Sequence, residues 1–315
     1  MADYLSETDQ RLIAALQCDG RLSARRAGEV LGLDSRVAQQ RIGALLADGT
    51  VRVSATPPRA PGLGAMLLRI RVLSGRIDTI TAALAAREDV PFIDVSASGD
   101  ELSAVLLTAP GQHNRLVFQQ LPATTAVTSV AAETVLHVYA EAHDWRVDVL
   151  TATERAALTV PRPAEPATRI TGETDRAIAA LLADDGRASA VALAARVGVP
   201  ESTVRRRVAV LFGRGQLQTT VAVDPRRLGL HVDANLWITL PARHLDATGR
   251  ALAAHPAVHG ALAVTGPASL HLAVWLRDLD DLYRFLTEEL AAYPITGVDT
   301  VLVGSAAKRP GTAGR

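Results

Sequence analysis

The amino-acid sequence repeats itself at a constant offset of 166 residues. ETDQRLIAALQCDGRLS (residues 7–23) and ETDRAIAALLADDGRAS (residues 173–189) are identical at nine of seventeen positions without a gap. The register continues beyond these segments, so that Arg41 corresponds to Arg207. A repeat of this length determines the architecture before any single motif is considered. We therefore interpret the chain as a tandem duplication.

The composition is that of an ordinary globular protein of two or three domains. The chain has 315 residues, 48% of them hydrophobic, and its 33 Lys and Arg balance its 33 Asp and Glu. Because Cys18 is the only cysteine, neither an intrachain disulfide nor a multi-cysteine metal site can form. No signal peptide and no apolar run of 18 residues is present. We expect a cytoplasmic protein without a membrane span, a metal or a cofactor.

Each copy begins with three predicted helices. In the first, Leu12, Ala15 and Leu16 follow the i, i+3, i+4 spacing of one buried face, and Asp-Gly at residues 19–20 and 185–186 ends the first helix of each copy. Serine caps and glycine ends are expected for the second helix. The third helix has a predicted buried face of Ala38, Ile42 and Leu45 in the first copy and Val204, Val208 and Leu211 in the second. Three short helices with a tight turn before the third indicate a helix-turn-helix.

The rest of each copy predicts strand, helix, hairpin, helix and strand, for which a ferredoxin-like βαββαβ fold is natural. In the first copy, the second of these helices is expected at residues 111–121. The fold class is then α+β, with two winged helix-turn-helix domains alternating with two ferredoxin-like domains. The predicted boundaries are helix-turn-helix domains at 1–54 and 170–224, α/β domains at 63–142 and 230–305, a proline-rich linker at 143–169 and a tail at 306–315.

These segments together resemble the Lrp/AsnC (feast/famine) family of transcriptional regulators. ETDRAIAALLADDGRAS, LAARVGV, STVRRRVAVL and GRGQL follow one another as in its DNA-binding domain, and the βαββαβ segments are similar to its RAM (ACT-like) effector-binding and oligomerisation domain. The resemblance covers about residues 5–142 and 170–305, as in a fused two-unit form. It implies binding to double-stranded DNA, homo-oligomers formed through the α/β domains, and regulation by a small molecule such as an amino acid. The sequence leaves open whether the two α/β domains pair within one chain or between chains.

The third helix of each copy supplies the candidate DNA-binding residues, because a recognition helix reads base edges from the major groove. They are Ser35, Arg36, Gln39, Gln40 and Arg41 in the first copy and Ser202, Thr203, Arg205, Arg206 and Arg207 in the second. Arg205 or Arg206 is suited to guanine. Arg41 and Arg207 border the buried face, where an arginine reaches a phosphate or braces the second helix. A charge run more often forms only a solvated helix face, but the repeated helix-turn-helix favours nucleic-acid contact.

The two copies are predicted to differ in packing and in charge. The second helix contains Ala27-Gly28 in the first copy and Leu193-Ala194 in the second, and glycine costs a helix about 1 kcal/mol relative to alanine. Residues 170–230 hold nine Arg against six acidic residues, whereas residues 1–53 hold seven of each. We expect the second unit to be better packed and to bind DNA more strongly. Since Gln favours adenine and Arg favours guanine, the operator should be asymmetric.

The central hairpin turns are the candidate effector site, by resemblance to the family's glycine turn. The residues are Ser98, Gly99 and Asp100 in the first copy and Thr265, Gly266 and Ser269 in the second. The family's Gly-x-x-Asp pattern is absent from both turns, and Asp100 and Ser269 are the candidate substitutes. Backbone amides of such a turn can hold a carboxylate.

Two other functions remain open. A tetrapyrrole enzyme of the siroheme decarboxylase type is similar in its two-part fold, and His113, Arg115 and His137 would then be suspected. A ligand-sensor or assembly protein whose helix-turn-helix parts no longer bind DNA is the third alternative. The pair His255 and His259 has metal-ligand spacing, but no third ligand accompanies it. No motif for a catalytic nucleophile, P-loop or dinucleotide site is present.

Overall fold

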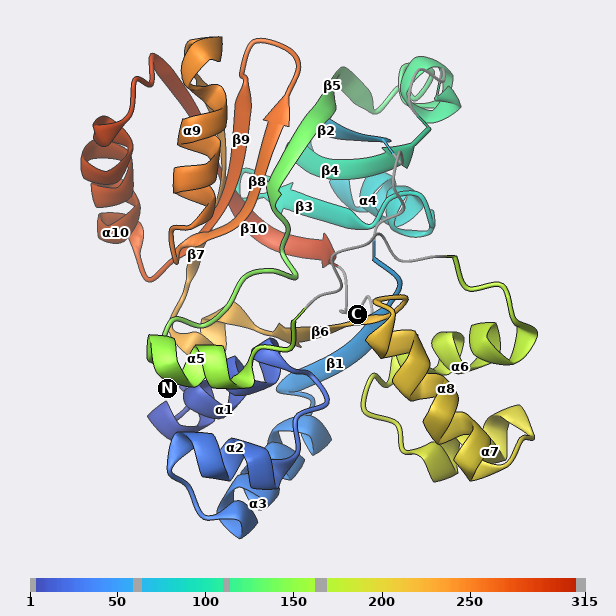
Figure 1. The fold of residues 1–315 in the computed structure, drawn as a ribbon. Helices are drawn as coiled ribbons and strands as arrows, with labels where there is room; N and C mark the ends of the chain where they lie inside the picture. Colours follow the sequence, from blue (N-terminus) through green and yellow to red (C-terminus); the bar gives the residue numbers. More distant parts are fainter. Residues whose placement is uncertain (1–3, 59–63, 110–113, 162–168, 310–315) are drawn as a thin grey trace. The chain divides into compact units, whose positions relative to one another are not determined.

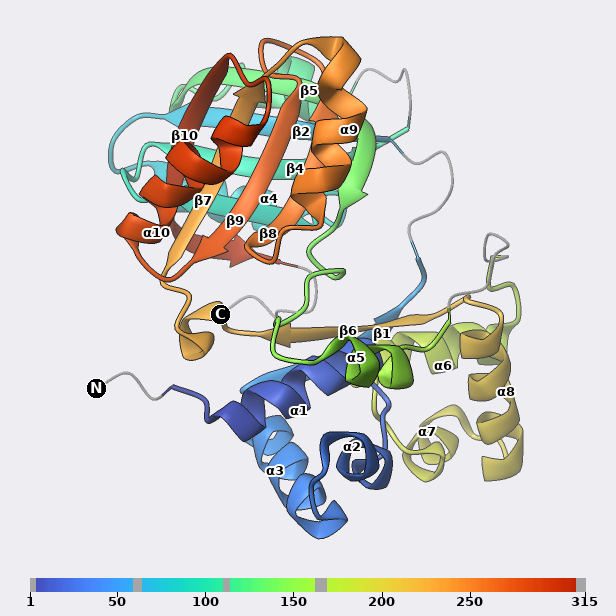
Figure 2. The same cartoon turned by 60° about the vertical axis from the view of Figure 1, so that its left-hand side comes forward.

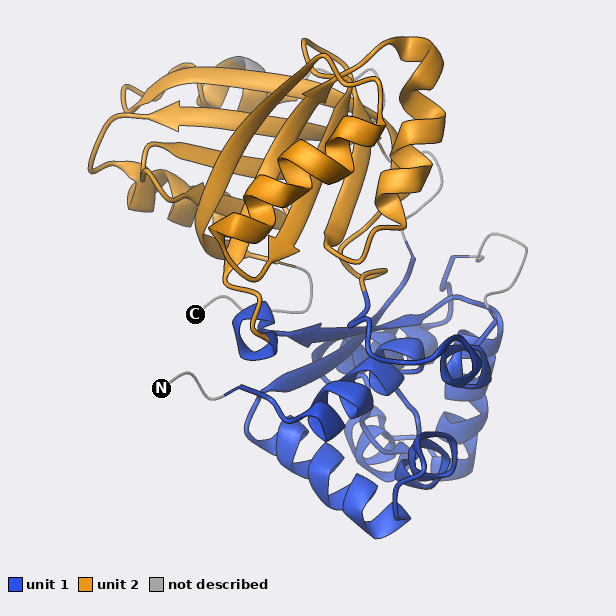
Figure 3. Ribbon diagram, turned by 90° about the vertical axis from the view of Figure 1, so that its left-hand side faces the viewer, with its two compact units in different colours: residues 1–61, 146–228 blue, residues 62–145, 229–315 orange. Residues whose placement is uncertain are grey.

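The computed structural model describes residues 4–58, 64–109, 114–161 and 169–309 (Figure 1). The chain forms two compact units, and each unit draws on both halves of the sequence (Figure 3). Unit 1 contains residues 1–61 and 146–228, and unit 2 contains residues 62–145 and 229–315.

Unit 1 contains two helical modules, each with three helices and a following strand. The first comprises α1 (Glu7–Cys18), α2 (Ala24–Leu31), α3 (Ser35–Ala47) and β1 (Val51–Thr56). The second comprises α6 (Glu173–Asp184), α7 (Ala190–Val197), α8 (Glu201–Gly213) and β6 (Gln218–Val223), followed by the 3-10 turn η2 (Pro225–Leu228).

Local capping defines the middle helix of both modules. The side-chain oxygens of Ser23 and Ser189 accept hydrogen bonds from backbone amides three residues further on, which satisfies donors that a helix N-terminus leaves open. Gly32 and Gly198 end α2 and α7 in the left-handed conformation, with φ of 68° and 75°. The predicted second helix and its tight turn to the third are confirmed in both modules.

Strands β1 and β6 join the two helical modules. They pair antiparallel over six residue pairs, from Val51 opposite Val223 to Thr56 opposite Gln218. Each strand belongs to a different half of the sequence, so the wing of one module is completed by the wing of the other. The two modules therefore form one unit within a single chain.

The prediction that residues 143–169 form only a linker is wrong. The helix α5 (Ala152–Leu158) lies in this segment and begins with a capping box between Thr151 and Glu154. Arg11 of α1 donates to Glu154 at 2.5 Å, and the Val147 amide donates to the Gln17 side chain at 2.8 Å. Residues 162–168, which hold two of the linker prolines, lie outside the described residues.

The second helical module is not better packed than the first, contrary to expectation. Six residues of α1 are buried, whereas in α6 only Ile178 and Leu182 are, because α5 packs against α1. Gly28 also has a structural reason: a Cβ there would lie 2.7 Å from the Leu33 carbonyl oxygen. The glycine therefore permits the close turn from α2 to α3.

Unit 2 contains two α/β modules with the same order of strands and helical segments. The first comprises β2 (Gly64–Val72), α4 (Ile77–Ala85), β3 (Phe92–Ser96), β4 (Glu101–Thr108), the π-helical turn η1 (Leu116–Gln120) and β5 (Val127–Ala140). The second comprises β7 (Val232–Thr239), α9 (Ala242–Ala253), β8 (Val258–Val264), β9 (Leu270–Leu276), α10 (Leu279–Arg284), the short turns η3 (Phe285–Glu289) and η4 (Leu290–Ala292), and β10 (Gly297–Lys308). The helix predicted at 111–121 is reduced in its described part to η1.

The eight strands of unit 2 close into a barrel in the order β10-β3-β4-β2-β5-β8-β9-β7. Within each module the last strand pairs with the first, and it also pairs with the other module: β5 with β8, and β10 with β3. These two cross-module pairings leave no free sheet edge in the barrel. The α/β modules therefore pair within one chain.

Two apolar cores lie between the strands and the helices that cover them. Alternate residues of β2 and β4, such as Leu68 and Leu106, pack against Ile80 and Leu84 of α4. Strands β7, β8 and β9 pack in the same way beneath α9 and α10 (Figure 2). The helices consequently occupy the outside of the barrel, and the remaining face of each strand points inward.

The inward faces carry polar and aromatic side chains. The Arg69 guanidinium lies 4.1 Å from the ring centre of Trp237 and bonds Glu101 at 2.9 Å and Asp299 at 2.7 Å. These residues come from both α/β modules, so the stack and the ion pairs join the two modules inside the barrel.

The predicted tail from residue 306 is partly strand, because β10 continues to Lys308. Arg309 follows it and bonds Asp94 of β3 at 2.9 Å and Asp233 of β7 at 2.5 Å. Burial raises the pKa of Asp94 above its ordinary value, although the charge of Arg309 works in the opposite direction. Arg309 thereby holds the end of β10 against both modules.

His271 of β9 should make the stability of unit 2 depend on pH. The residue is 5% exposed, neither ring nitrogen has a hydrogen-bond partner among the described residues, and burial lowers its pKa to about 3. Unfolding restores a pKa of about 6.5, so the unfolded chain binds the extra proton and stability falls as the pH decreases from about 6.5 towards 3. Replacing His271 with Leu should therefore raise the free energy of unfolding by about 2 kcal/mol more at pH 5 than at pH 7.5.

Urea unfolding followed by tryptophan fluorescence measures this difference, because all three tryptophans belong to unit 2. The exposed His137 is the matched control, as His137→Leu. An equal effect of His271→Leu at both pH values, or an equal pH dependence in the control, would contradict the burial argument.

Candidate nucleic-acid interface

Helix α3 presents the polar surface predicted for the first copy. Ala38, Ile42 and Leu45 are buried. The predicted reading residues Ser35, Arg36, Gln39 and Gln40 are all exposed. The side chain of Asp34 caps the helix by accepting hydrogen bonds from the amides of residues 36 and 37. The cap leaves the first turn of α3 ordered and its side chains free to contact DNA.

Helix α8 presents a more basic surface. Val204 and Leu211 are buried, and Val208 packs partly against the same core, as predicted. The candidate residues of its first two turns point away from that core, with Ser202, Arg205 and Arg206 exposed and Thr203 half-buried. The helices α3 and α8 lie apart on the two sides of unit 1 (Figures 1 and 2).

The two outward arginines of α8 differ in their intramolecular partners. Arg205 forms an ion pair with Glu201 one turn earlier on the same exposed helix face. Exposed pairs of this spacing contribute only about 0.3–0.5 kcal/mol, so a phosphate or a base can replace the carboxylate. Arg206 is exposed and has no ion-pair partner within the described residues. Arg206 is therefore the more available of the two.

Arg41 and Arg207 brace the first helix of their modules, whereas the sequence predicts a phosphate contact or a brace of the second helix. Arg207 Nη1 lies 2.8 Å from Asp175 on α6, and Arg41 Nη1 lies 2.9 Å from Asp9 on α1. The same ion pair thus occurs at equivalent positions of both modules. We accordingly interpret these two arginines as positioning residues for the recognition helices.

Sequence reasoning overlooked Arg21 and Arg187. In the structure each guanidinium crosses to the other helical module and bonds its backbone carbonyls. Both arginines stand in an Asp-Gly-Arg triplet that the two copies share, and this identity was the available signal. It was used only to locate the end of the first helix.

The first candidate effector turn is closed by its own side chains. It joins β3 to β4, with Gly99 at a φ of 73°. Ser98 Oγ donates to Asp100 at 2.5 Å, and this hydrogen bond lowers the pKa of the Asp100 carboxyl. A ligand carboxylate at this turn would therefore have to compete with Asp100.

The second candidate turn, between β8 and β9, is held by the first α/β module. The Thr265 amide donates to the Thr134 carbonyl of β5 at 2.9 Å, and Thr265 Oγ1 accepts from the Thr134 amide at 2.8 Å. A Cβ at Gly266 would lie 2.9 Å from the Glu133 side chain. Ser269 lies apart from this contact, and its Oγ donates to the Leu240 carbonyl.

Other candidate sites receive no support from the described geometry. His255 Nδ1 accepts from the Ala257 amide, and His259 faces Asp233, so they do not share a ligand position. No group of three metal-ligating side chains occurs in the described ranges. Arg115 bonds Gln119, whereas His137 stacks edge-on against Tyr139. His113 lies outside the described residues.

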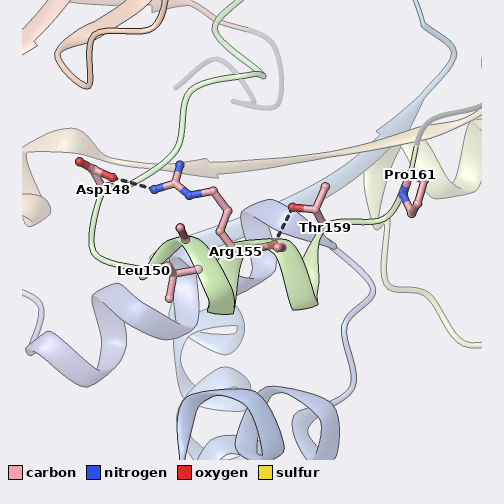
Figure 4. Close-up of a pocket in the computed structure, with 7 residues that line it drawn as sticks. Asp148, Leu150, Arg155, Thr159 and Pro161 are labelled. Carbon is pink, nitrogen blue, oxygen red and sulfur yellow. Dashed lines mark hydrogen bonds and ion pairs between the residues drawn. The ribbon is translucent and has the colours of Figure 1, made fainter.

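A shallow pocket beside α5 is lined by residues 148–161 (Figure 4). Its charged groups, Arg155 and Asp148, bond each other at 2.7 Å, and Thr159 Oγ1 donates to the Arg155 carbonyl. The pocket contains no unsatisfied group that points to a ligand, and we assign it no function.

Comparison with known proteins agrees with this geometry. Family models match an AsnC-type helix-turn-helix domain at residues 173–211, a winged helix-turn-helix DNA-binding domain at 5–52 and an Lrp/AsnC ligand binding domain at 233–312. An uncharacterized HTH-type transcriptional regulator of Pyrococcus abyssi is 37% identical over 120 residues, which are 38% of this chain and 76% of the relative. The chain belongs to the Lrp/AsnC family of transcriptional regulators.

Two further comparisons concern a second relative and a solved structure. The HTH-type transcriptional regulator AldR of Mycolicibacterium smegmatis is 32% identical over 149 residues, which are 45% of this Lrp/AsnC-family chain and 85% of AldR. The crystal structure of the siroheme decarboxylase NirDL covers 96% of this chain and 93% of its own, with a TM-score of 0.60 and 14% identity. That likeness shows the fold alone. No helix in the described parts of this Lrp/AsnC regulator is long and apolar enough to cross a membrane.

Removing Arg207 should destabilise the second helical module without removing a DNA contact. Arg207→Ala and Asp175→Ala should each cost about 1 kcal/mol, and the double variant should cost little more than either one, because the partners act as a pair. Thermal unfolding followed by circular dichroism gives the stabilities, with Arg41→Ala and Asp9→Ala as the equivalent pair. A salt dependence of DNA binding that falls by about one unit in Arg207→Ala alone would instead identify a phosphate contact.

Proposed function

We propose that this chain is a fused two-copy Lrp/AsnC regulator that binds an asymmetric DNA operator with two unlike recognition helices. The proposed domains are 1–54 and 170–224 for DNA and 63–142 and 230–305 for pairing and effector binding. The Pyrococcus relative supports the fusion, since a match to 38% of this chain accounts for 76% of that protein.

The observation that carries the proposal is the pairing of two helix-turn-helix modules inside unit 1. Their strands β1 and β6 pair with each other, and α3 and α8 both expose their polar faces. DNA-binding proteins of this class place two recognition helices in successive major grooves, which normally requires a dimer. Here one chain supplies both helices.

The two recognition helices differ at equivalent outward positions. Gln39 and Gln40 of α3 occupy the places that Arg205 and Arg206 occupy on α8. Glutamine forms a bidentate pair with adenine, and arginine forms one with guanine O6 and N7. The half-site read by α8 should therefore be richer in guanine, and its arginines should give α8 the larger share of affinity.

A small-molecule effector, such as an amino acid, forms part of this proposal. Its candidate positions are the two hairpin turns, at residues 98–100 and 265–269. The matched Lrp/AsnC ligand binding domain, which includes the second turn, supports this placement.

The enzyme alternative rests on one observation, the likeness of the whole fold to siroheme decarboxylase NirDL. We favour a regulator without enzymatic activity, because the relatives of higher identity are named as transcriptional regulators. The stacked side chains of Arg69 and Trp237 lie on the inward face of the barrel, and for that reason we assign the barrel interior no ligand.

Replacing the outward arginines of α8 with alanine should lower the affinity for DNA and make the base preference less strict. Arg205→Ala with Arg206→Ala should relax the preference at one or two base pairs, by about 1–3 kcal/mol for each arginine–guanine pair that no longer forms. Gln39→Ala with Gln40→Ala should affect the other half-site. Selection of bound sequences, followed by fluorescence anisotropy at several salt concentrations, measures both effects.

The control variant carries Arg243→Ala with Arg250→Ala on α9. It removes two positive charges from exposed positions, as the α8 variant does, but outside the helix-turn-helix modules. A palindromic selected site, or an equal weakening of binding in the α8 variant and in the control, would contradict the assignment of unlike recognition helices.

The absorption spectrum distinguishes the regulator from the tetrapyrrole enzyme. Titration of the protein with an iron tetrapyrrole should leave the visible spectrum equal to the sum of its components, because we assign the barrel interior no ligand. A saturable spectral shift at one equivalent per chain, abolished by Trp237→Ala or Arg69→Ala, would support the enzyme instead.

A further inference from the structure

The Asp-Gly-Arg triplets at residues 19–21 and 185–187 meet in unit 1. Arg21 donates to the carbonyl of Gly186 at 2.5 Å and to that of Ala188 at 3.4 Å. Arg187 donates to the carbonyls of Gly20 at 2.6 Å and Leu22 at 3.0 Å. Each arginine thus bonds the turn that contains the other. We call this reciprocal contact of Arg21 and Arg187 the arginine clasp.

The glycines of the triplets bring each turn close to the strand of the other module. The Gly186 amide donates to Val53 of β1 at 2.8 Å, and a Cβ at Gly186 would lie 2.7 Å from the Ser54 carbonyl carbon. On the other side, the Gly20 amide donates to Thr219 of β6 at 3.1 Å, and a Cβ at Gly20 would lie 2.6 Å from Thr219 Cβ. A side chain at either position would force the modules apart.

The two positively charged guanidinium groups of the arginine clasp are partly buried. Burial lowers the pKa of both Arg21 and Arg187, and the charge of Arg21 lowers that of Arg187 further, while Asp19 and Asp185 act in the opposite direction. Two like charges that are partly buried repel each other, and the hydrogen bonds to backbone carbonyls offset part of that cost. The planar guanidinium suits this task because it donates to two carbonyls in a fixed geometry.

The clasp also reaches a recognition helix. The Arg21 guanidinium lies 5.6 Å from the ring centre of Phe212, which belongs to α8. Arg21 itself follows α1, the helix that Arg41 of α3 braces through Asp9. A continuous series of contacts therefore runs from α3 through α1 and the clasp to α8.

We propose that the arginine clasp sets the separation and relative orientation of α3 and α8, and so makes the protein selective for the spacing between its two half-sites. This inference rests on the proposed reading of DNA by α3 and α8. The β1–β6 ribbon packs against the second helical module through Ala55, but a two-stranded ribbon is variably twisted, so this attachment alone leaves the angle between the modules adjustable. The clasp supplies a second attachment at the Asp-Gly-Arg turns, which lie against Val53 and Thr219 of the ribbon, and this additional attachment restrains the twist between the modules.

Because DNA is helical, a fixed arrangement of α3 and α8 favours one spacing between the half-sites. With 10–10.5 base pairs per helical turn, one added base pair rotates the second half-site by about 34–36° around the duplex. A rigid pair of helices can meet only one spacing, whereas a loosely joined pair can follow several.

The first test measures binding to DNA in which the spacer between the half-sites changes by one base pair at a time across a full turn. We expect the wild-type chain to prefer one spacing about tenfold over spacings two base pairs away, and Arg21→Ala with Arg187→Ala to reduce this preference to about threefold or less. Arg21→Lys with Arg187→Lys should give an intermediate preference, because lysine keeps the charge without the planar fork. Binding to a single half-site should stay within about twofold of wild type in both variants.

The second test needs no DNA. Spin labels at Gln40→Cys on α3 and Arg206→Cys on α8, in a Cys18→Ser background, report the distance between the helices. The wild-type clasp should give one narrow distance distribution, and the alanine variant a broad one. Arg25→Ala with Arg196→Ala, on exposed positions of α2 and α7, is the matched control and should change neither the distribution nor the preferred spacing.

The outcomes separate this proposal from the function on which it rests. A wild-type chain that binds no half-site specifically would contradict the DNA-reading assignment, and the spin-label distances would still decide whether the clasp sets the separation. A specific wild-type chain without a spacing preference would overturn the proposal. So would a folded alanine variant with an unchanged preference and an unchanged distance. If Arg21→Ala with Arg187→Ala does not fold, the lysine variant decides the question. A spacing preference and a distance distribution equal to those of the wild type would then overturn the proposal.

Discussion

Unpaired strand edges are the constraint on which this structure depends. A four-stranded βαββαβ sheet has two edges with unsatisfied backbone groups, and here they belong to β3 and β5 in the first module and β8 and β10 in the second. Each edge is satisfied by the opposite module, through β5 with β8 and β10 with β3. In unit 1, β1 and β6 each gain one paired edge from the other helical module. Neither half of the sequence could satisfy its own strands, so the halves fold around each other.

The sequence predicted the elements better than their long-range pairing. Periodicity, serine caps and glycine ends are local signals, and they located α2 and α7 in both modules. The partner of an edge strand is not a local property, so the sequence left open whether the α/β modules pair within or between chains. Helix α5 was overlooked because prolines nearby indicate a linker, although Thr151 and Glu154 form a recognisable capping-box pattern.

Comparing the two copies distinguishes residues with a structural role from residues proposed to contact DNA bases. A single copy would not allow this distinction. The residues that stay identical, such as Arg41 with Arg207 and Arg21 with Arg187, contact other helices or the other module. The outward positions of the recognition helices have diverged, as in Gln40 against Arg206. A pattern of identity alone does not name the contact partner. The sequence therefore left a phosphate contact or a brace of the second helix as alternatives for Arg41 and Arg207, whereas the structure places Asp9 and Asp175 of the first helices beside them.

The closure of the barrel by strands of one chain also affects how the protein responds to its own abundance. Partner strands on the same polypeptide meet at an effective concentration set by the connecting chain and not by the cell. Dilution therefore does not separate β5 from β8 or β10 from β3. If one chain supplies both recognition helices, as proposed, occupancy of a two-part DNA site rises with the first power of protein concentration. A dissociable pair of single-unit regulators would instead show a steeper, threshold-like response.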